Sequence, residues 1–205
     1  MTQTYYANGV MFNLPNLVTF SRLLLIPVVA FILYLLALPG WQEHDFALSL
    51  IGGTAFAVAA ITDIIDGYLA RKLKLVSLAG KFFDPMADKL IHMAAMVMLI
   101  PLGRMSAWVA TFLLFREIFI TGLRSVAAGE GIIIAADKWG KWKTVWLNVA
   151  FSALIIHHTL FPGTFLQINT RAFGLACLWI GVFCAFVSGW QYTVGFWRSA
   201  KLKGL

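Results

Sequence analysis

The chain has 205 residues, of which 60% are hydrophobic and only 12% are charged, and its mean hydropathy is +0.82. A soluble domain carries about 25% charged residues, so this composition excludes an ordinary water-soluble protein and indicates an integral membrane protein. The net charge of +7 comes from 16 scattered lysines and arginines, too few and too dispersed for a nucleic-acid-binding surface. Basic residues beside membrane segments instead suit anionic lipid headgroups or a phosphorylated substrate.

Six long apolar segments are predicted to be transmembrane helices of a single domain, residues 1–205. Continuous apolar runs of about 20 residues indicate helices, because hydrocarbon admits only helices or closed barrels as spanning structures. The expected helices are Leu17–Leu38, Phe46–Arg71, Asp84–Leu102, Ala107–Val126, Lys143–Leu160 and Arg171–Trp197. The stretch MFNLPNLVTF is expected to form a short N-terminal interfacial segment before the first span. The predicted fold class is therefore an all-α integral membrane protein.

The distribution of basic residues predicts the orientation of these helices. With the N-terminus inside, the inner loops and the C-terminal tail carry eleven lysines and arginines. The outer loops carry only Arg104 and Arg171. This is a clear positive-inside pattern, so both termini are expected to face the cytoplasm.

The stretch TDIIDGYLARKLKLVSLAGKFFDPMADKL, residues 62–90, contains four of the six aspartates of the chain. Asp63 and Asp66 are three residues apart, and Asp84 and Asp88 are four apart, so each pair shares one helical face. Packing of the two helices would bring four carboxylates together, which is unfavourable unless a cation offsets their charge. Carboxylates are preferred ligands of Mg²⁺ and Mn²⁺, and two such ions serve phosphoryl chemistry.

Each aspartate by itself has a simpler interpretation. Asp63 or Asp66 could be a helix-terminal charge that pairs with a nearby lysine. Asp84 could be the N-cap of the third helix, with Pro85 in its first turn. These readings explain single residues, but they do not explain four acids in one short stretch that apolar segments flank on both sides.

The whole spacing resembles the signature of the CDP-alcohol phosphotransferase family, without a departure. It reads Asp63-x2-Asp66-Gly67-x2-Ala70-Arg71-x8-Gly80-x3-Asp84-x3-Asp88. The residue types suit a phosphate ligand, since a glycine admits substrate close to the backbone and an arginine binds phosphate. The resemblance implies a six-helix membrane enzyme, usually a homodimer, with its site open to the cytoplasm. It also implies that an alcohol hydroxyl attacks the β-phosphate of a CDP-linked lipid and that CMP leaves.

The resemblance further implies roles for single residues. Asp63, Asp66 and Asp84 would hold two Mg²⁺ or Mn²⁺ ions, and Asp88 would complete the second metal site and act as general base. The residues implied to line the pocket for the CDP-lipid are Gly67, Ala70, Arg71, Ser77 and Gly80. Thr19 and Arg22, on the first turns of the first span, are further candidates for contact with the CDP-lipid, and a structural hydrogen bond is the alternative.

The acceptor is expected to be glycerol 3-phosphate, with phosphatidylglycerophosphate as the product. Residues 13–27 (NLPNLVTFSRLLLIP) and 116–144 (REIFITGLRSVAAGEGIIIAADKWGKWKT) resemble the phosphatidylglycerophosphate synthase branch of the family. Arg116 lies well inside an expected span, where a cation needs an anion. The candidates for binding the acceptor phosphate are Arg116, Arg124, Lys138, Lys141 and Lys143. The alternatives are an ion pair of Arg116 with Glu117 or with another helix, and ordinary inner-side charge for the lysines.

Several rival functions remain open at this point. Inositol phosphate, serine, or phosphatidylglycerol, as in a cardiolipin synthase, would be accepted by the same chemistry. A divalent-cation transporter is the rival from another class, but the acids cluster at one membrane face and do not cross it. A purely structural subunit leaves the acids unexplained. The expected partners are CDP-diacylglycerol, glycerol 3-phosphate, membrane lipids and a second copy of the chain, in a bacterial inner membrane and without nucleic acid.

Overall fold

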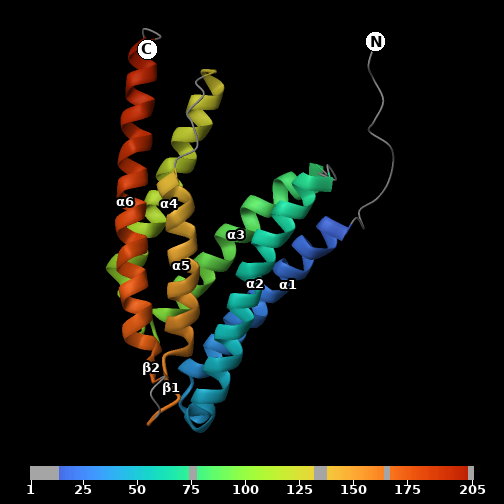
Figure 1. Ribbon diagram of the computed structural model, residues 1–205, viewed down its shortest axis with the longest axis vertical. Helices are drawn as coiled ribbons and strands as arrows, with labels where there is room; N and C mark the ends of the chain where they lie inside the picture. Colours follow the sequence, from blue (N-terminus) through green and yellow to red (C-terminus); the bar gives the residue numbers. More distant parts are fainter. Residues whose placement is uncertain (1–13, 74–77, 132–137, 164–166, 203–205) are drawn as a thin grey trace.

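The computed structural model describes residues 14–73, 78–131, 138–163 and 167–202 (Figure 1). Within these ranges, only the backbone is described for residues 14–23, 63–85, 88 and 202. The α-helices are α1 (Leu14–Ala37), α2 (Asp45–Leu73), α3 (Leu78–Leu99), α4 (Ala107–Gly129), α5 (Lys138–Ile156) and α6 (Thr170–Leu202). A 3-10 helix, η1 (Pro39–His44), joins α1 to α2. Two antiparallel strands, β1 (Thr159–Leu160) and β2 (Ile168–Asn169), lie between α5 and α6. The prediction of six helices is confirmed.

The helices form two groups that α3 connects (Figure 1). In the first group α5 packs along α6, and α4 also packs on α6; in the second group α1 packs on α2. Contacts of α2 with α5 and of α3 with α1 hold the groups together. In Figure 1, η1, β1 and β2 lie at the lower end, and the two groups of helices diverge upward from there. The end of α2 lies at the top of one group and the C-terminal end of α6 at the top of the other.

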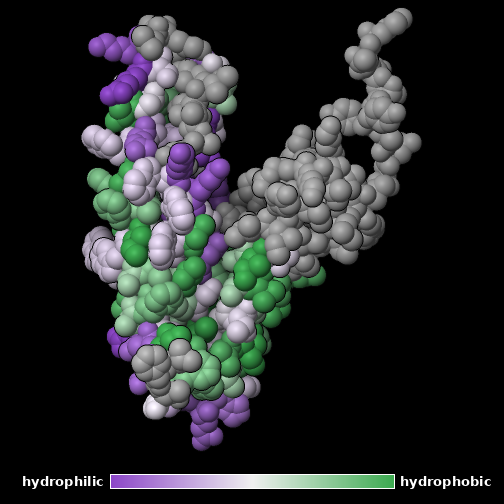
Figure 2. Space-filling view, viewed as in Figure 1, coloured by the Kyte–Doolittle hydropathy of each residue, from purple (hydrophilic) through white to green (hydrophobic). Residues whose placement is uncertain are grey.

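An apolar core forms where α1, α2, α3 and α5 meet. Leu33, Phe56, Leu99, Phe151 and Leu154 are each 0% exposed. The outer surface is apolar as well, and Figure 2 shows hydrophobic side chains over much of the middle of the molecule and hydrophilic ones at its lower tip. Exposed apolar surface of this extent is unfavourable in water and matches a hydrocarbon solvent.

Glycines allow the closest helix contacts. A Cβ added to Gly53 on α2 would meet Ile156 Cγ1 at 2.4 Å and the Ser152 carbonyl oxygen at 3.1 Å. A Cβ added to Gly181 on α6 would meet Leu147 Cδ2 of α5 at 2.8 Å. Small residues at such contacts let helix backbones approach, which is how helices associate where no water is present to drive them together.

Two helical segments of the described chain are long and apolar enough to cross a membrane. They are Pro39–Thr62 and Thr170–Lys201, and shorter apolar helices cover Leu24–Ala37 and Lys89–Leu99. The structure therefore gives a mostly helical protein with two candidate spans, which is a coarser result than the six spans expected from the sequence.

Several predicted boundaries need correction, among them the start of the fifth helix, which lies at Lys138 and not at Lys143, and the end of the sixth, which lies at Leu202 and not at Trp197. The third helix begins at Leu78 and not at Asp84, so Asp84 is not its N-cap and Pro85 lies inside the helix and not in its first turn. The sequence reasoning took Pro85 for a start signal, but membrane helices tolerate internal proline because neighbouring groups satisfy the freed carbonyl. The fifth helix ends at Ile156, before the strands, and not at Leu160. From Leu14 onward the expected interfacial segment belongs to α1, and residues 1–13 lie outside the described ranges.

A buried ion network ties the loops together at the lower end. Arg104, in the turn between α3 and α4, is 7% exposed and its Nη2 lies 2.9 Å from Asp45 Oδ1 at the start of α2. Arg104 also donates to the Ser49 hydroxyl at 3.0 Å and to the Ile155 carbonyl. His158 Nε2 lies 2.7 Å from Asp45 Oδ2. Burial lowers the pKa of Arg104, while Asp45 raises it again in part. Arg104, expected as a loop charge, is thus a buried link between three segments.

Candidate active site

The signature aspartates lie at the end of the molecule that carries the C-terminus of α2 and the N-terminus of α3. Asp63 and Asp66 are in the second half of α2, and Asp84 and Asp88 are in the first half of α3. These helices run in opposite directions, and α1 packs against both (Figure 1). The side chains of the four aspartates lie outside the described residues, as do those of the other signature candidates: Thr19, Arg22, Gly67, Ala70, Arg71, Ser77 and Gly80.

The donor set of the signature fits hard divalent cations, since four carboxylates supply only oxygen ligands. Elsewhere in the described ranges, no group of three or more His, Cys, Asp or Glu side chains could hold a metal ion.

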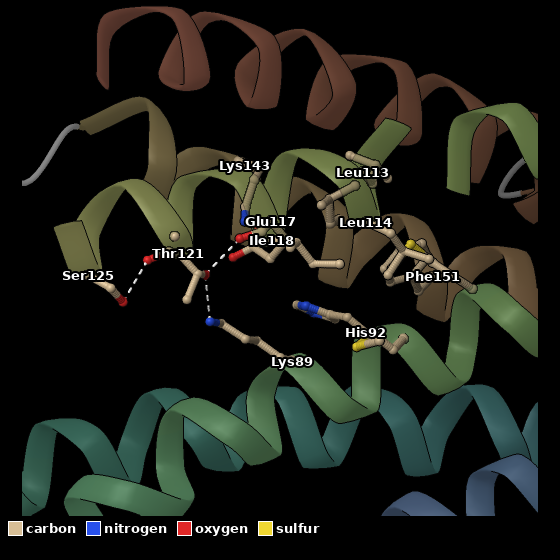
Figure 3. A pocket seen from close by; sticks show the side chains of 14 residues that line it. Lys89, His92, Leu113, Leu114, Glu117, Ile118, Thr121, Ser125, Lys143 and Phe151 are labelled. Atoms are coloured by element: carbon tan, nitrogen blue, oxygen red, sulfur yellow. Dashed lines mark hydrogen bonds and ion pairs between the residues drawn. The ribbon is translucent and has the colours of Figure 1, made fainter. Parts of the chain in front are cut away.

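A cavity of about 350 Å³ opens beside the signature, between α3, α4 and α5 (Figure 3). Its α3 wall begins at Lys89, the residue that follows Asp88 in the chain. One end of the cavity is polar and the other is apolar, with Leu113, Leu114 and Phe151 among the apolar lining residues. The cavity thus offers charged and hydroxyl groups near Lys89, in the middle of α3, and a hydrophobic wall farther along.

Glu117 of α4 organises the charges of the polar end. Its Oε2 lies 2.7 Å from Lys143 Nζ of α5 and 3.1 Å from Arg116 Nη1. Arg116 also donates to the Ser188 hydroxyl at 2.7 Å and to the Ala185 carbonyl at 3.3 Å, both on α6. Arg116 and Lys143 are 9% and 8% exposed. One carboxylate therefore balances two buried cations and joins α4, α5 and α6.

A second polar contact crosses the cavity from α3 to α4. Lys89 Nζ donates to Thr121 Oγ1 at 2.9 Å, and the Thr121 hydroxyl donates to the Glu117 carbonyl at 2.7 Å (Figure 3). One turn farther on, the Ser125 hydroxyl donates to the Thr121 carbonyl at 3.1 Å. The Thr121 oxygen is thus held as an acceptor for the lysine ammonium.

Aromatic rings and an amide hold the helices together beside the cavity. His92 of α3 hydrogen-bonds the Asn148 side-chain oxygen of α5 and lies 5.6 Å from the Phe151 ring. Phe56 of α2 meets Phe151 edge-on at 6.0 Å. His92 therefore packs between α3 and α5 through these contacts with Asn148 and Phe151.

The residues predicted to bind the acceptor phosphate are only partly gathered. Arg116 and Lys143 meet through Glu117, which is the ion-pair alternative foreseen for Arg116. The Arg124 guanidinium lies 5.1 Å from the centre of the Tyr192 ring on α6, a cation–π distance. The remaining two predicted residues, Lys138 and Lys141, are exposed at the start of α5.

Sequence reasoning missed three residues of this cavity. Lys89 follows Asp88 directly, so its place in the chain was a usable signal. Glu117 was considered only as a partner for Arg116, although an acid inside an expected span is itself a functional candidate. Thr121 gave no sequence signal for a functional role, because a threonine whose hydroxyl bonds the carbonyl four residues earlier is common in helices.

Comparison with known proteins identifies the class. The family model for CDP-alcohol phosphatidyltransferase matches residues 12–187, and the chain belongs to this family. A relative from Bacillus subtilis (strain 168) is 40% identical over 197 residues, which cover 93% of this chain and 98% of the relative. A relative from Haemophilus influenzae is 39% identical over 151 residues, covering 70% and 76%. A third, from Rickettsia typhi, is 33% identical over 180 residues, covering 88% and 94%.

All three relatives carry the same name, CDP-diacylglycerol–glycerol-3-phosphate 3-phosphatidyltransferase. The matched region includes the signature segment, the cavity and the first half of α6. The resemblance that the four aspartates suggested is therefore confirmed at the level of the family, which is a family of membrane proteins.

Proposed function

We propose that this protein transfers the phosphatidyl group of CDP-diacylglycerol to glycerol 3-phosphate, which yields phosphatidylglycerophosphate and CMP. The observation that carries the proposal is the signature of four aspartates beside a cavity whose polar end holds Lys89 and Lys143, with Arg116 behind Glu117. Membership of the family and the common name of relatives at 33–40% identity support the same reaction.

In the proposed reaction, the acceptor hydroxyl oxygen attacks the phosphorus that carries the diacylglycerol, and the bond from that phosphorus to CMP breaks. Asp88 takes the proton of the hydroxyl, because a general base must lie within hydrogen-bond reach of the proton that it removes. Two Mg²⁺ or Mn²⁺ ions, held by Asp63, Asp66, Asp84 and Asp88, would offset the charge of the diphosphate. The donor-binding residues are proposed to be Gly67, Ala70, Arg71, Ser77 and Gly80, with Thr19 and Arg22.

The proposed site for the acceptor phosphate lies at the polar end of the cavity. Lys143 and Arg116 both contact the Glu117 carboxylate, and Lys89 lines the same end of the cavity, so basic groups are available there for a phosphate. Charge-assisted hydrogen bonds to phosphate are about twice as strong as neutral ones. Arg124, Lys138 and Lys141 would raise the local concentration of the anionic acceptor from farther away.

We further propose six membrane crossings, with the signature end and both termini in the cytoplasm of a bacterial cell, and a homodimer as the assembled state. The excess of basic residues on the proposed inner side supports this orientation. The exposed apolar side chains around α1 to α6 support insertion in a bilayer.

An acceptor panel tests the proposal. Purified protein in lipid nanodiscs receives CDP-diacylglycerol, Mg²⁺ or Mn²⁺, and one acceptor at a time, and released CMP is measured. We expect release with glycerol 3-phosphate and little with inositol phosphate, serine or phosphatidylglycerol. Release with one of the other acceptors alone would overturn the assignment of the acceptor. Transport of a divalent cation without CMP release would overturn the reaction itself.

A further inference from the structure

We propose that Lys89 is a binding residue for the phosphate of the acceptor and makes the enzyme prefer phosphorylated acceptors; this inference rests on the proposed function. Lys89 belongs to neither the family signature nor the basic segment that the sequence assigned to the acceptor. It lines the polar end of the cavity together with Glu117, Thr121 and Lys143 (Figure 3).

The direction of the lysine side chain is set by α4. Lys89 Nζ lies 2.9 Å from Thr121 Oγ1, so the ammonium reaches across the cavity from α3. Since the Thr121 hydroxyl gives its own proton to the Glu117 carbonyl, its oxygen is free to accept from the lysine. Two of the three ammonium protons remain available to a ligand, because a lysine ammonium has three donors and this contact uses one.

The charges around the cavity favour an anion at this place. Lys143 and Arg116 both contact the Glu117 carboxylate, and Lys89 brings a further cation to the lining of this end. Among the described residues, no carboxylate lies within ion-pair distance of Lys89, whose described polar contact is the neutral Thr121 hydroxyl. A phosphate bound by Lys89 would supply the anionic partner for its ammonium group, and charges in an apolar surrounding need such a partner.

The position of Lys89 also fits the geometry of the reaction. Lys89 follows Asp88 directly on α3, and Asp88 is the proposed general base. A phosphate held by Lys89 keeps the short carbon chain of the acceptor near the aspartates. Orientation of this kind turns a bimolecular encounter into a reaction within one complex.

The test compares Lys89→Met, Lys89→Arg and Thr121→Val with the unchanged protein in lipid nanodiscs. Steady-state CMP release is measured while glycerol 3-phosphate and CDP-diacylglycerol are varied separately. We expect Lys89→Met to raise the KM for glycerol 3-phosphate roughly ten- to hundredfold, the usual cost of a lost hydrogen bond to a charged group. The KM for CDP-diacylglycerol should change less than about twofold. Lys89→Arg should recover much of the affinity, and Thr121→Val should raise the same KM by a smaller factor.

The matched control is Lys201→Met, which removes the same charge from an exposed position near the end of α6. It should leave both KM values unchanged. An unchanged KM for glycerol 3-phosphate in Lys89→Met, or an equal rise in both KM values, would overturn the role of Lys89 while the proposed function stands. A fall in kcat alone that Lys89→Arg does not reverse would do the same. If the unchanged protein releases no CMP with glycerol 3-phosphate, the proposed function fails and the role of Lys89 fails with it.

Discussion

Replacement of Glu117 by glutamine removes one charge and keeps the shape of the side chain. In the structure, Glu117 Oε2 lies 2.7 Å from Lys143 Nζ and 3.1 Å from Arg116 Nη1, and both cations are buried. Glu117→Gln therefore removes a carboxylate that contacts two buried cations. Removal of one partner from a buried ion pair costs about 3–5 kcal/mol.

The expected loss for Glu117→Gln is smaller than this range. The Glu117 side chain is 34% exposed, so solvent screens part of the interaction, and the glutamine oxygen still accepts a hydrogen bond. We expect a loss of about 2 kcal/mol in the free energy of unfolding. For a chain of this length, that lowers the midpoint of thermal unfolding by about 4–8 °C.

Thermal unfolding in one detergent, followed by circular dichroism, measures the effect. Glu43→Gln is the matched control, since Glu43 is exposed on η1, and its midpoint should equal that of the unchanged protein. The double variant Glu117→Gln/Lys143→Met should lose less than the sum of the two single changes, because both single changes break the same Glu117–Lys143 ion pair. Equal midpoints for the two glutamine variants, or additive losses in the double variant, would refute the reasoning.

Three further predictions concern other parts of the molecule. Asp88→Asn should abolish CMP release and preserve most of the binding of CDP-diacylglycerol, because the amide cannot take the acceptor proton; substantial turnover would rule out Asp88 as the base. Gly53→Ala should cost about 1–3 kcal/mol, since the new Cβ would meet Ile156 Cγ1 at 2.4 Å, whereas Gly40→Ala meets nothing within 4 Å and should be neutral in the same unfolding assay. Burial, with the positive charge of neighbouring groups, lowers the pKa of His157 to about 4. The folded state then resists protonation more than the unfolded state does, so stability should fall as pH drops from about 6.5 towards 4. His157→Asn, which suits the positive φ of 54° there, should flatten that slope, and an unchanged slope would contradict this cause.

Local sequence patterns were sufficient to predict the six helices and the family of the protein. Runs of apolar residues predicted six helices because each run satisfies its own backbone within one segment. The aspartate spacing predicted the family because the chemistry needs those residue types at those positions along two consecutive helices. The predicted start of α3, Asp84, lies about a turn and a half after the observed start, Leu78. The prediction was wrong because Pro85 is compatible both with a first turn and with the interior of a membrane helix.

Contacts between segments distant in sequence were not predictable in the same way. Arg104 was expected as a loop charge, but its partners Asp45 and Ile155 come from the start of α2 and the end of α5. Arg116 was expected either to bind phosphate or to form an ion pair, and only the packing of α4 on α6 brought Ser188 within 2.7 Å of it. No periodicity in the chain encodes such pairs.

The sequence by itself determined the membrane class, the helices and the carboxylates of the signature, since these follow from composition and from spacing within one or two neighbouring helices. The tertiary structure alone decided which cations share Glu117, that Lys89 reaches Thr121 across the cavity, and where Gly53 lets α2 approach α5. These features depend on how helices cross, and crossing is set by the summed packing of many side chains rather than by any local pattern.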